Sequence, residues 1–240
     1  MIVIKNLEKW YRNSLALEVE DLVIEQNEFL GIVGNNGAGK TTLLRLLLDL
    51  IKADKGVVTS DNIPVSSSTA WKSYTSSYID EQFLIDFLTP EEFFHFTGNA
   101  YGFSSNIIDE KLKKYEVFFN DEILGKRKKY IRDFSRGNKQ KIGICSALLV
   151  EPKVLILDEP FNGLDPSSQA ILNQLLIREN AQRGTCIILS SHDLDQVTQV
   201  CKKIAIIEKG KLVRTIVNSD QALSELKSYF SVGKILEDES

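Results

Sequence analysis

One stretch of this sequence decides its fold: Gly34-Asn35-Asn36-Gly37-Ala38-Gly39-Lys40-Thr41-Thr42. Its spacing, G-x-x-x-x-G-K-T, lies between an apolar run that predicts a strand, 29–33, and a leucine-rich run that predicts a buried helix, 43–48. The glycines permit backbone conformations closed to other residues, so successive N–H groups can point at one anion. The start of the helix adds the positive end of its dipole. The stretch therefore predicts a phosphate-binding P-loop.

Two side chains of the P-loop have defined tasks at a bound nucleotide. Lys40 is expected to reach the β- and γ-phosphates, and the Thr41 hydroxyl is expected to ligate Mg²⁺. A glycine-rich turn with a surface lysine is the simpler alternative, but every fixed position of the pattern is present between strand and helix. The predicted nucleotide-binding residues are Gly34, Asn35, Asn36, Gly37, Ala38, Gly39, Lys40, Thr41 and Thr42.

Length and composition limit the kind of protein. The 240 residues, 43% of them hydrophobic, fit one large α/β domain with room for a subdomain. The net charge of −4 argues against nucleic acid as the main partner. The N-terminus lacks a signal-peptide pattern, and no apolar run approaches the roughly 18 residues of a membrane span. Any membrane role is therefore expected to come through a partner.

The three cysteines predict a reducing compartment. Cys145, Cys186 and Cys201 are an odd number at long spacings, and each lies in apolar surroundings. This pattern is typical of reduced thiols in a protein core rather than of disulfides or a metal site. We therefore expect a cytosolic location.

Two carboxylates follow a short, continuously apolar run, 154–157, which predicts a central parallel strand. Open α/β sheets bind ligands at the carboxyl ends of their strands, where Asp158 and Glu159 are placed. Asp158 is expected to hold Mg²⁺, directly or through water, and Glu159 to polarise a water aimed at the γ-phosphate. An acidic strand-ending turn is the structural alternative, which the P-loop makes less attractive.

A histidine and an aromatic pair are further candidates. A second apolar run, 185–190, delivers His192 at its end, where the ring could donate to the γ-phosphate. Short apolar runs at 2–4, 15–19 and 22–24 predict strands of an antiparallel sheet, and Trp10 and Tyr11 lie between the first two runs. Either ring could stack on adenine, with packing on the sheet as the alternative.

The middle and the end of the chain predict helices and a hairpin. Thr89 is a plausible N-cap of a helix whose apolar face is Phe93, Phe94 and Phe96, and a helical region is expected to run on through 107–119. The basic run 126–129 is expected to be a solvated surface. A buried helix opens near 133–141, and a turn at 162–166 precedes another over 167–180. The last expectations are a hairpin turning at Lys209-Gly210, a helix over 223–230 and a frayed acidic end, 237–240.

The order of these motifs resembles the ATP-binding subunit of ATP-binding cassette (ABC) transporters over essentially the whole chain. The discriminating piece is Phe134-Ser135-Arg136-Gly137-Asn138, which looks like that family's signature loop and separates it from kinases, GTPases and other P-loop ATPases. The resemblance implies an α/β fold: a P-loop NTPase (RecA-like) core with an N-terminal antiparallel β-subdomain and an inserted α-helical subdomain. The implied boundaries are 1–80 with 150–215 for β-subdomain and core, 88–149 for the helical subdomain, and 216–240 for a C-terminal extension.

The resemblance also implies roles for single residues. Tyr11 falls at the adenine-stacking position, Asp165 in the D-loop, and His192 at the switch histidine. The implied catalytic residues are Glu159, His192 and Lys40, with Thr41 and Asp158 as metal ligands. The implied signature residues are Ser135, Arg136, Gly137 and Asn138.

A head-to-tail dimer, of two identical or two different subunits, follows from the same resemblance. Each ATP would lie between the P-loop, Asp158, Glu159 and His192 of one subunit and the signature loop of the other. The signature helix would bring a second positive dipole and backbone donors to the γ-phosphate. Nucleotide would thereby favour the closed state.

Two departures from the family pattern affect these assignments. Arg136 stands where the family commonly has Gly, and Asn138 where Gln is common. The family's Q-loop glutamine is ambiguous here, because counting from Tyr78 selects Glu81 whereas matching residue type selects Gln82. Both remain candidates for metal contact and for coupling to a membrane subunit.

The function implied is an ATP-hydrolysing subunit that drives a separate transmembrane permease, bound peripherally at the inner face of the cell membrane. Arg136 and the acidic Q-loop region favour an exporter. The alternative is a soluble ABC-type ATPase of translation or DNA maintenance, but the chain has one cassette and no sustained heptads between Lys40 and Ser135. A regulatory module without turnover is disfavoured by Glu159 and His192.

Overall fold

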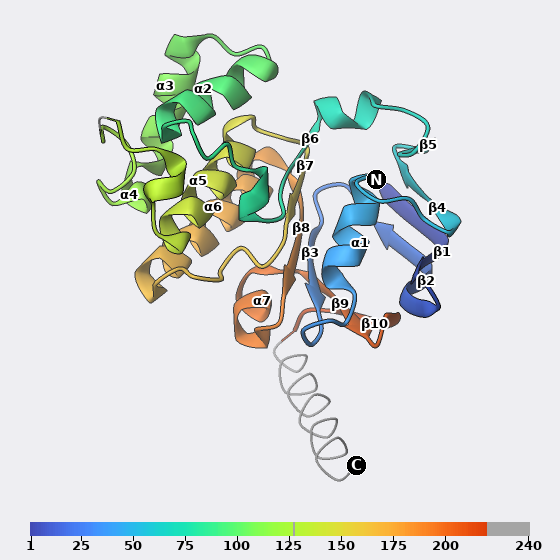
Figure 1. Ribbon diagram of the computed structural model, residues 1–240. Helices are drawn as coiled ribbons and strands as arrows, with labels where there is room; N and C mark the ends of the chain where they lie inside the picture. Colours follow the sequence, from blue (N-terminus) through green and yellow to red (C-terminus); the bar gives the residue numbers. More distant parts are fainter. Residues whose placement is uncertain (127, 220–240) are drawn as a thin grey trace. The chain divides into compact units, whose positions relative to one another are not determined.

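The computed structural model describes residues 1–126 and 128–219 (Figure 1). By its internal contacts the chain forms two compact units. Of the described residues, unit 1 comprises Met1–Ser66 and 188–219, and unit 2 comprises Ser67–Ile187 without residue 127. The helix expected over 223–230, the acidic end and all but the first residues of the C-terminal extension lie outside the described residues.

Unit 1 is built on a mixed sheet with the order β5-β4-β1-β2-β10-β9-β3. β1 pairs antiparallel with both β2 and β4, which confirms the antiparallel sheet expected before residue 28, with longer strands than expected. Its strands are β1 (Ile2–Tyr11), β2 (Ser14–Ile24), β3 (Phe29–Val33), β4 (Lys55–Ser60), β5 (Ile63–Pro64), β9 (Lys203–Glu208) and β10 (Lys211–Val217).

β3 is the strand that leads into the P-loop. All five residues of β3 are buried, and β3 runs parallel to β9 in the register Leu30↔Lys203 to Val33↔Ile206. The helix after the P-loop, α1 (Lys40–Leu47), buries four of its leucines. The hairpin of β9 and β10 turns at Lys209 and Gly210, as the sequence predicts. A short helix, α7 (Leu194–Val200), follows β8 (Cys186–Ser191), whose residues 188–191 belong to this unit.

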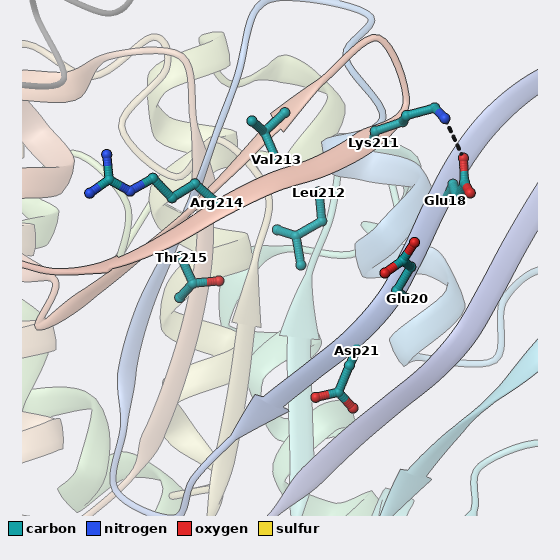
Figure 2. A pocket seen from close by; sticks show the side chains of 8 residues that line it. All are labelled: Glu18, Glu20, Asp21, Lys211, Leu212, Val213, Arg214 and Thr215. Atoms are coloured by element: carbon teal, nitrogen blue, oxygen red, sulfur yellow. Dashed lines mark ion pairs between the residues drawn. The ribbon is translucent and has the colours of Figure 1, made fainter.

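In this sheet β10 lies parallel to β2, and the two strands share a single register pair, Lys211↔Glu18. The Lys211 ammonium lies 2.8 Å from the Glu18 carboxylate. Beside it is an open pocket of about 330 Å³ (Figure 2). The pocket is lined by Glu18, Glu20, Asp21, Lys211, Leu212, Val213, Arg214 and Thr215. None of these belongs to the predicted site.

Unit 2 places helices around two short parallel strands, β6 (Thr75–Tyr78) and β7 (Val154–Leu157), which pair residue by residue from Thr75↔Val154 to Tyr78↔Leu157. Its helices are α2 (Pro90–Ala100), α3 (Ser105–Leu112), α4 (Glu116–Phe119), α5 (Arg136–Leu149) and α6 (Pro166–Arg183). Single 3₁₀ turns lie at Ala70–Ser73, Glu81–Phe83, Lys113–Tyr115 and Ile131–Asp133.

The first helix of unit 2 begins as its sequence predicts. The Thr89 hydroxyl accepts the Glu92 N–H at 3.3 Å, and the Glu92 carboxylate accepts the Thr89 N–H at 2.8 Å, which is a capping box. Phe93 and Phe94 are buried, and the Phe94 ring lies 5.7 Å from that of Phe119. Phe96 was wrongly placed on this apolar face, because its side chain is 57% exposed. The three cysteines are free and buried, as expected.

Helix α5 lies directly on β6. At Gly143 a β-carbon would be 2.0 Å from the ring of Tyr78, closer than any real contact. The ring is buried, and this burial, followed by the charges of Glu81 and Asp80, raises the pKa of Tyr78. The absence of a side chain at Gly143 thus sets how closely the helix approaches the strand.

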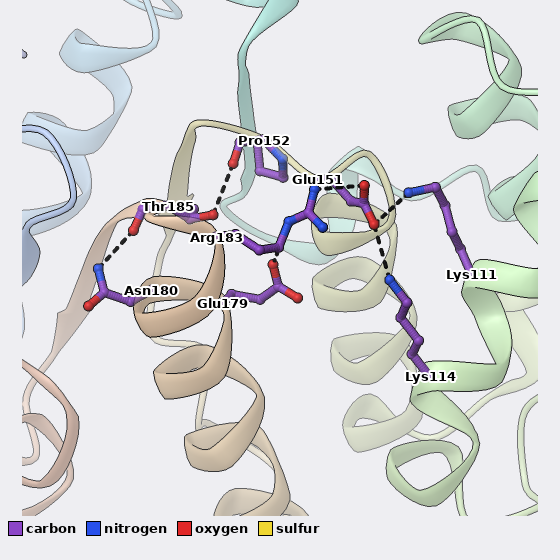
Figure 3. A network of polar contacts seen from close by, with 8 residues as sticks. All are labelled: Lys111, Lys114, Glu151, Pro152, Glu179, Asn180, Arg183 and Thr185. Atoms are coloured by element: carbon purple, nitrogen blue, oxygen red, sulfur yellow. Dashed lines mark hydrogen bonds and ion pairs between the residues drawn. The ribbon is translucent and has the colours of Figure 1, made fainter.

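A carboxylate cluster joins four segments of unit 2 (Figure 3). Glu151, after α5, accepts from Lys111 at 2.6 Å, from Lys114 at 3.1 Å and from Arg183 at 2.7 Å. Burial alone would raise the pKa of Glu151, but hydrogen bonds from Lys111 and Lys114 outweigh it and lower the pKa from 4.5 to about 2. The ionised carboxylate therefore stabilises unit 2.

The Gly143 contact yields a stability test. Ala is the better helix former by about 1 kcal/mol, so an unobstructed Gly143→Ala change should stabilise the protein. Here the added methyl meets the Tyr78 ring, and we expect the free energy of unfolding to fall by roughly 1–3 kcal/mol. Denaturant unfolding measures this, and Gly143→Ala combined with Tyr78→Val should recover part of the loss. An equally or more stable single variant would contradict the close packing of α5 on β6.

The Glu151 cluster predicts a pH dependence. A carboxylate whose pKa is lowered on folding stabilises the native state above its unfolded pKa and loses that effect as pH falls through its folded pKa. Glu151→Gln should therefore cost about 1–2 kcal/mol at neutral pH, allowing for screening by water. The gap to wild type should close as the pH falls from 4.5 towards 2. Unfolding curves of both proteins across this range measure it, and a gap independent of pH would contradict the assignment.

Candidate functional site

The loop predicted to be the phosphate cradle lies in unit 1. The loop leaves the buried end of β3 and closes with Gly39 as the N-cap of α1. The Lys40 ammonium lies 2.8 Å from the Gly34 carbonyl and 3.3 Å from the Asn35 carbonyl, so the side chain folds back over its own loop. Lys40 is buried, whereas residues 35–37 are exposed at the rim. The Lys40 ammonium is thus held by carbonyl groups of the loop itself.

Gly39 is required by the backbone. Its φ of 110° lies in the region that side-chain-bearing residues rarely adopt, and a β-carbon there would be 2.8 Å from the Ala16 carbonyl. The loop is also tied to the β9–β10 turn, because the Gly210 N–H donates to the Ala38 carbonyl at 3.0 Å. The cradle is therefore held by the sheet on one side and by α1 on the other.

Tyr11 and His192 also lie in unit 1. Tyr11 ends β1 with its ring 49% exposed, and the Lys9 ammonium lies 5.6 Å from the ring centre. Trp10 is 41% exposed, and its indole N–H donates to Glu8 at 2.9 Å. His192 is exposed directly after β8, and the following Asp193 caps α7 by accepting the N–H groups of Asp195 and Gln196.

Two acidic segments meet at one edge of unit 2. Because β6 and β7 are parallel and in register, Tyr78 and Leu157 end side by side, and the Asp158 N–H donates to the Tyr78 carbonyl at 3.0 Å. Asp158 is only 8% exposed, whereas Glu159 is half-buried and has a left-handed φ of 45°. The Q-loop candidates Glu81 and Gln82 follow β6 at this edge, in a turn capped by Asp80.

The predicted signature residues form the start of α5. The Ser135 hydroxyl accepts the Asn138 N–H at 3.3 Å and caps the helix. Ser135 and Arg136 are exposed, and Gly137 and Asn138 are half-buried. The Lys139 ammonium lies 3.9 Å from the Glu81 carboxylate, which connects this helix to the Q-loop segment.

Asp165 has a structural role that the sequence analysis did not assign. Its carboxylate caps α6, accepting the N–H groups of Ser167 and Ser168 at 3.0 Å each and both of their hydroxyls. Hydrogen bonds from Ser167 and then Ser168 hold the pKa of Asp165 well below its usual range. The residue predicted to lie in the D-loop is therefore fixed at the start of α6.

The predicted residues thus fall into two groups, each within one unit. Unit 1 holds the P-loop, Tyr11 and His192, and unit 2 holds the acidic pair, the Q-loop segment, the signature loop and Asp165. The sequence analysis missed Gln140, whose carboxamide donates to the carbonyls of Glu159 and Pro160 at 3.2 Å each. The sequence signal for Gln140 was that a polar residue stands near the start of a helix that is predicted to be buried.

No helix in residues 1–126 or 128–219 is both long enough and apolar enough to cross a membrane.

Comparison with known proteins places the chain among related sequences. The model of the family described as ABC transporter matches residues 17–162. An uncharacterized ABC transporter ATP-binding protein of Bacillus subtilis is 33% identical, over 96% of this chain and 74% of the relative. A methionine import ATP-binding protein of Carboxydothermus hydrogenoformans is 31% identical, over 93% of this chain and 68% of the relative.

Solved structures share the fold. A structure described as the ATP-binding subunit of an ABC transporter aligns with a TM-score of 0.82 at 26% identity, over 96% of this chain and 93% of that one. A dimeric ATP-binding cassette in a post-hydrolysis state with ADP and phosphate aligns with a TM-score of 0.81 at 22% identity, over 91% of this chain and 99% of that one. The expected fold class, a P-loop NTPase of α/β type, is confirmed.

The family match spans well over half of the chain, and it includes both the P-loop and the acidic pair. This chain belongs to the ABC transporter family, as an ATP-binding subunit with the ATPase domain of that family.

Proposed function

We propose that this chain hydrolyses ATP as half of a head-to-tail dimer that drives a separate transmembrane permease. The observation that carries the proposal is the geometry of the P-loop. Lys40, the first residue of α1, is buried, and its ammonium lies 2.8 Å from the Gly34 carbonyl. A bound phosphate would meet this ammonium together with the backbone donors and the helix dipole.

Each step of the chemistry is assigned to a residue that the sequence predicts. Lys40 stabilises charge on the β- and γ-phosphates, and His192 donates to the γ-phosphate. Glu159 accepts the proton of the attacking water. Tyr11, whose ring is half exposed, stacks on the adenine.

Mg²⁺ fits the donors that the chain offers. Thr41 supplies a hydroxyl oxygen, and Asp158 supplies a carboxylate that is 8% exposed at a strand end. Hard oxygen ligands with few protein contacts are what this cation prefers. When bound, it would neutralise charge on the phosphate oxygens. Either Glu81 or Gln82 is available as the Q-loop contact.

The second subunit is proposed to close each site. Ser135 and Arg136 are exposed at the start of α5, a helix of 14 residues, so its positive end is accessible to another molecule. A signature loop acting on the partner's ATP would make binding favour the closed dimer, and hydrolysis would release it. The two subunits are either identical or different.

A permease is the proposed membrane partner. Three phenylalanines of unit 2 are exposed after the Q-loop segment and on α2: Phe83 at 51%, Phe87 at 69% and Phe96 at 57%. Exposed aromatic side chains of this size are typical of protein interfaces. Docking there would hold the subunit at the inner face of the membrane.

The direction of transport follows from the permease. Arg136 and the acidic Q-loop segment led us to expect export, whereas a methionine import protein is among the relatives at 31% identity. The names of the relatives thus weigh towards import. The substrate is selected by the permease.

The alternative function, a soluble ABC-type ATPase of translation or DNA maintenance, predicts association with ribosomes or DNA instead of a permease.

Replacing the proposed base tests the ATPase cycle. Glu159→Gln removes the proton acceptor but keeps the shape, so we expect kcat to fall by about 100-fold or more while ATP still binds. The variant should accumulate as an ATP-bound dimer, measured by gel filtration with and without ATP and Mg²⁺. Lys40→Ala is the matched control, because it should lose ATP binding and stay monomeric. A Glu159→Gln protein that is monomeric at saturating ATP and turns over normally would contradict the proposal.

The exposed phenylalanines test the membrane partner. In cells that naturally express the chain, we expect it to co-purify with a polytopic membrane protein, and Phe87→Asp should weaken this association by roughly 10-fold or more. Val117→Ser is the control, since Val117 is 74% exposed on α4, away from the Q-loop segment in sequence. Recovery of ribosomes without a membrane protein would favour the alternative function.

A further inference from the structure

Gln140 holds the backbone that carries the proposed base. Its carboxamide nitrogen, on the second turn of α5, donates at 3.2 Å to the Glu159 carbonyl and at 3.2 Å to the Pro160 carbonyl. One side chain thus satisfies two successive acceptors of a loop that lies 19 residues further along the chain. Gln140 itself is not among the residues proposed to touch nucleotide, metal or partner.

The loop needs such support where Glu159 stands. The φ of Glu159 is 45°, a left-handed conformation that costs about 1–3 kcal/mol in a residue other than glycine and persists only where neighbours enforce it. The Glu159 carbonyl also accepts the Asn162 N–H at 3.1 Å. Gln140 and the Asn162 N–H therefore both fix the peptide plane next to the strained residue.

The same loop touches the signature residues of the same chain. A β-carbon at Gly137 would lie 2.6 Å from the Gly163 carbonyl, and one at Gly163 would lie 3.6 Å from the Arg136 side chain. The first turn of α5 and residues 159–163 are thus packed closely against each other. This contact and the two hydrogen bonds of Gln140 together join the start of α5 to residues 159–163.

We infer that Gln140 is a positioning residue for ATP hydrolysis: it couples the signature helix to the orientation of the Glu159 carboxylate in the same chain. The inference rests on the proposed function, in which Ser135 and Gly137 engage the partner's ATP while Glu159 serves the chain's own ATP. A displacement of α5 on contact with one nucleotide is passed by Gln140 to the residue that acts on the other. Each subunit thereby links the two sites of the dimer.

The test compares two glutamines that serve the same loop. Gln140→Met keeps the length of the side chain and removes its donors, so Glu159 loses its fixed orientation. We expect kcat to fall by about 10- to 100-fold with unchanged affinity for ATP, because the cradle of Lys40 is untouched. Gln169→Met is the matched control, since Gln169 donates from α6 to the carbonyls of Phe161 and Leu164, beyond Glu159. It should keep a near-normal kcat with a comparable change in thermal stability. Equal kcat values of the two variants would overturn the inference.

A double-mutant cycle separates positioning from structural damage. If Gln140 acts through Glu159, then Gln140→Met should cost nothing further in the residual kcat of Glu159→Gln, and the doubly substituted chain should still form the ATP-bound dimer. A further loss of kcat, or loss of that dimer, would show that Gln140 acts elsewhere and would overturn the inference. If Gln140→Met fails to fold, the same cycle with Gln140→Glu, which keeps the shape without the two donors at neutral pH, decides between these outcomes. Wild-type turnover and the Glu159→Gln dimer test the proposed function independently of Gln140.

Discussion

The parallel register of β6 and β7 is the constraint on which unit 2 depends. Because Tyr78 pairs with Leu157, the two strands end together, and the segments after them start at the same edge. One hydrogen bond, from the Asp158 N–H to the Tyr78 carbonyl, extends the pairing into the acidic pair itself. A shift of β7 by one residue would turn each of its side chains to the other face of the sheet and would move Asp158 and Glu159 relative to the segment that follows β6.

Helix α5 contacts β6 and both of the segments that follow β6 and β7. It lies on β6 through the space left at Gly143, reaches the Q-loop segment through Lys139 and Glu81, and holds the loop after β7 through Gln140. Its capped start presents Ser135 and Arg136 outward. In the proposed function, one helix thus carries the signature residues at its start and Gln140, which holds the backbone of Glu159, at its second turn.

The sequence predicted the parts of this fold that local patterns encode. The P-loop, the apolar strands, the Thr89 cap and the turn at Lys209 depend on residues close in sequence, and the structure has them where expected. It could not predict contacts across long separations, such as that of Gln140 with Glu159, because a helical pattern shows which face is buried but not what lies against it. The prediction that Phe96 is buried was wrong because it rested on residue type alone. Exposed aromatic side chains also occur, and they are typical of interfaces.

The central claim is that one chain holds only half of each ATP site. It is tested most directly by measuring the ATPase rate per mole of chain as the concentration of the chain is varied at saturating ATP. If a second copy supplies the signature loop, the specific activity should rise with concentration and level off once the dimer predominates. A specific activity that is constant down to concentrations at which the chain is monomeric would contradict the account.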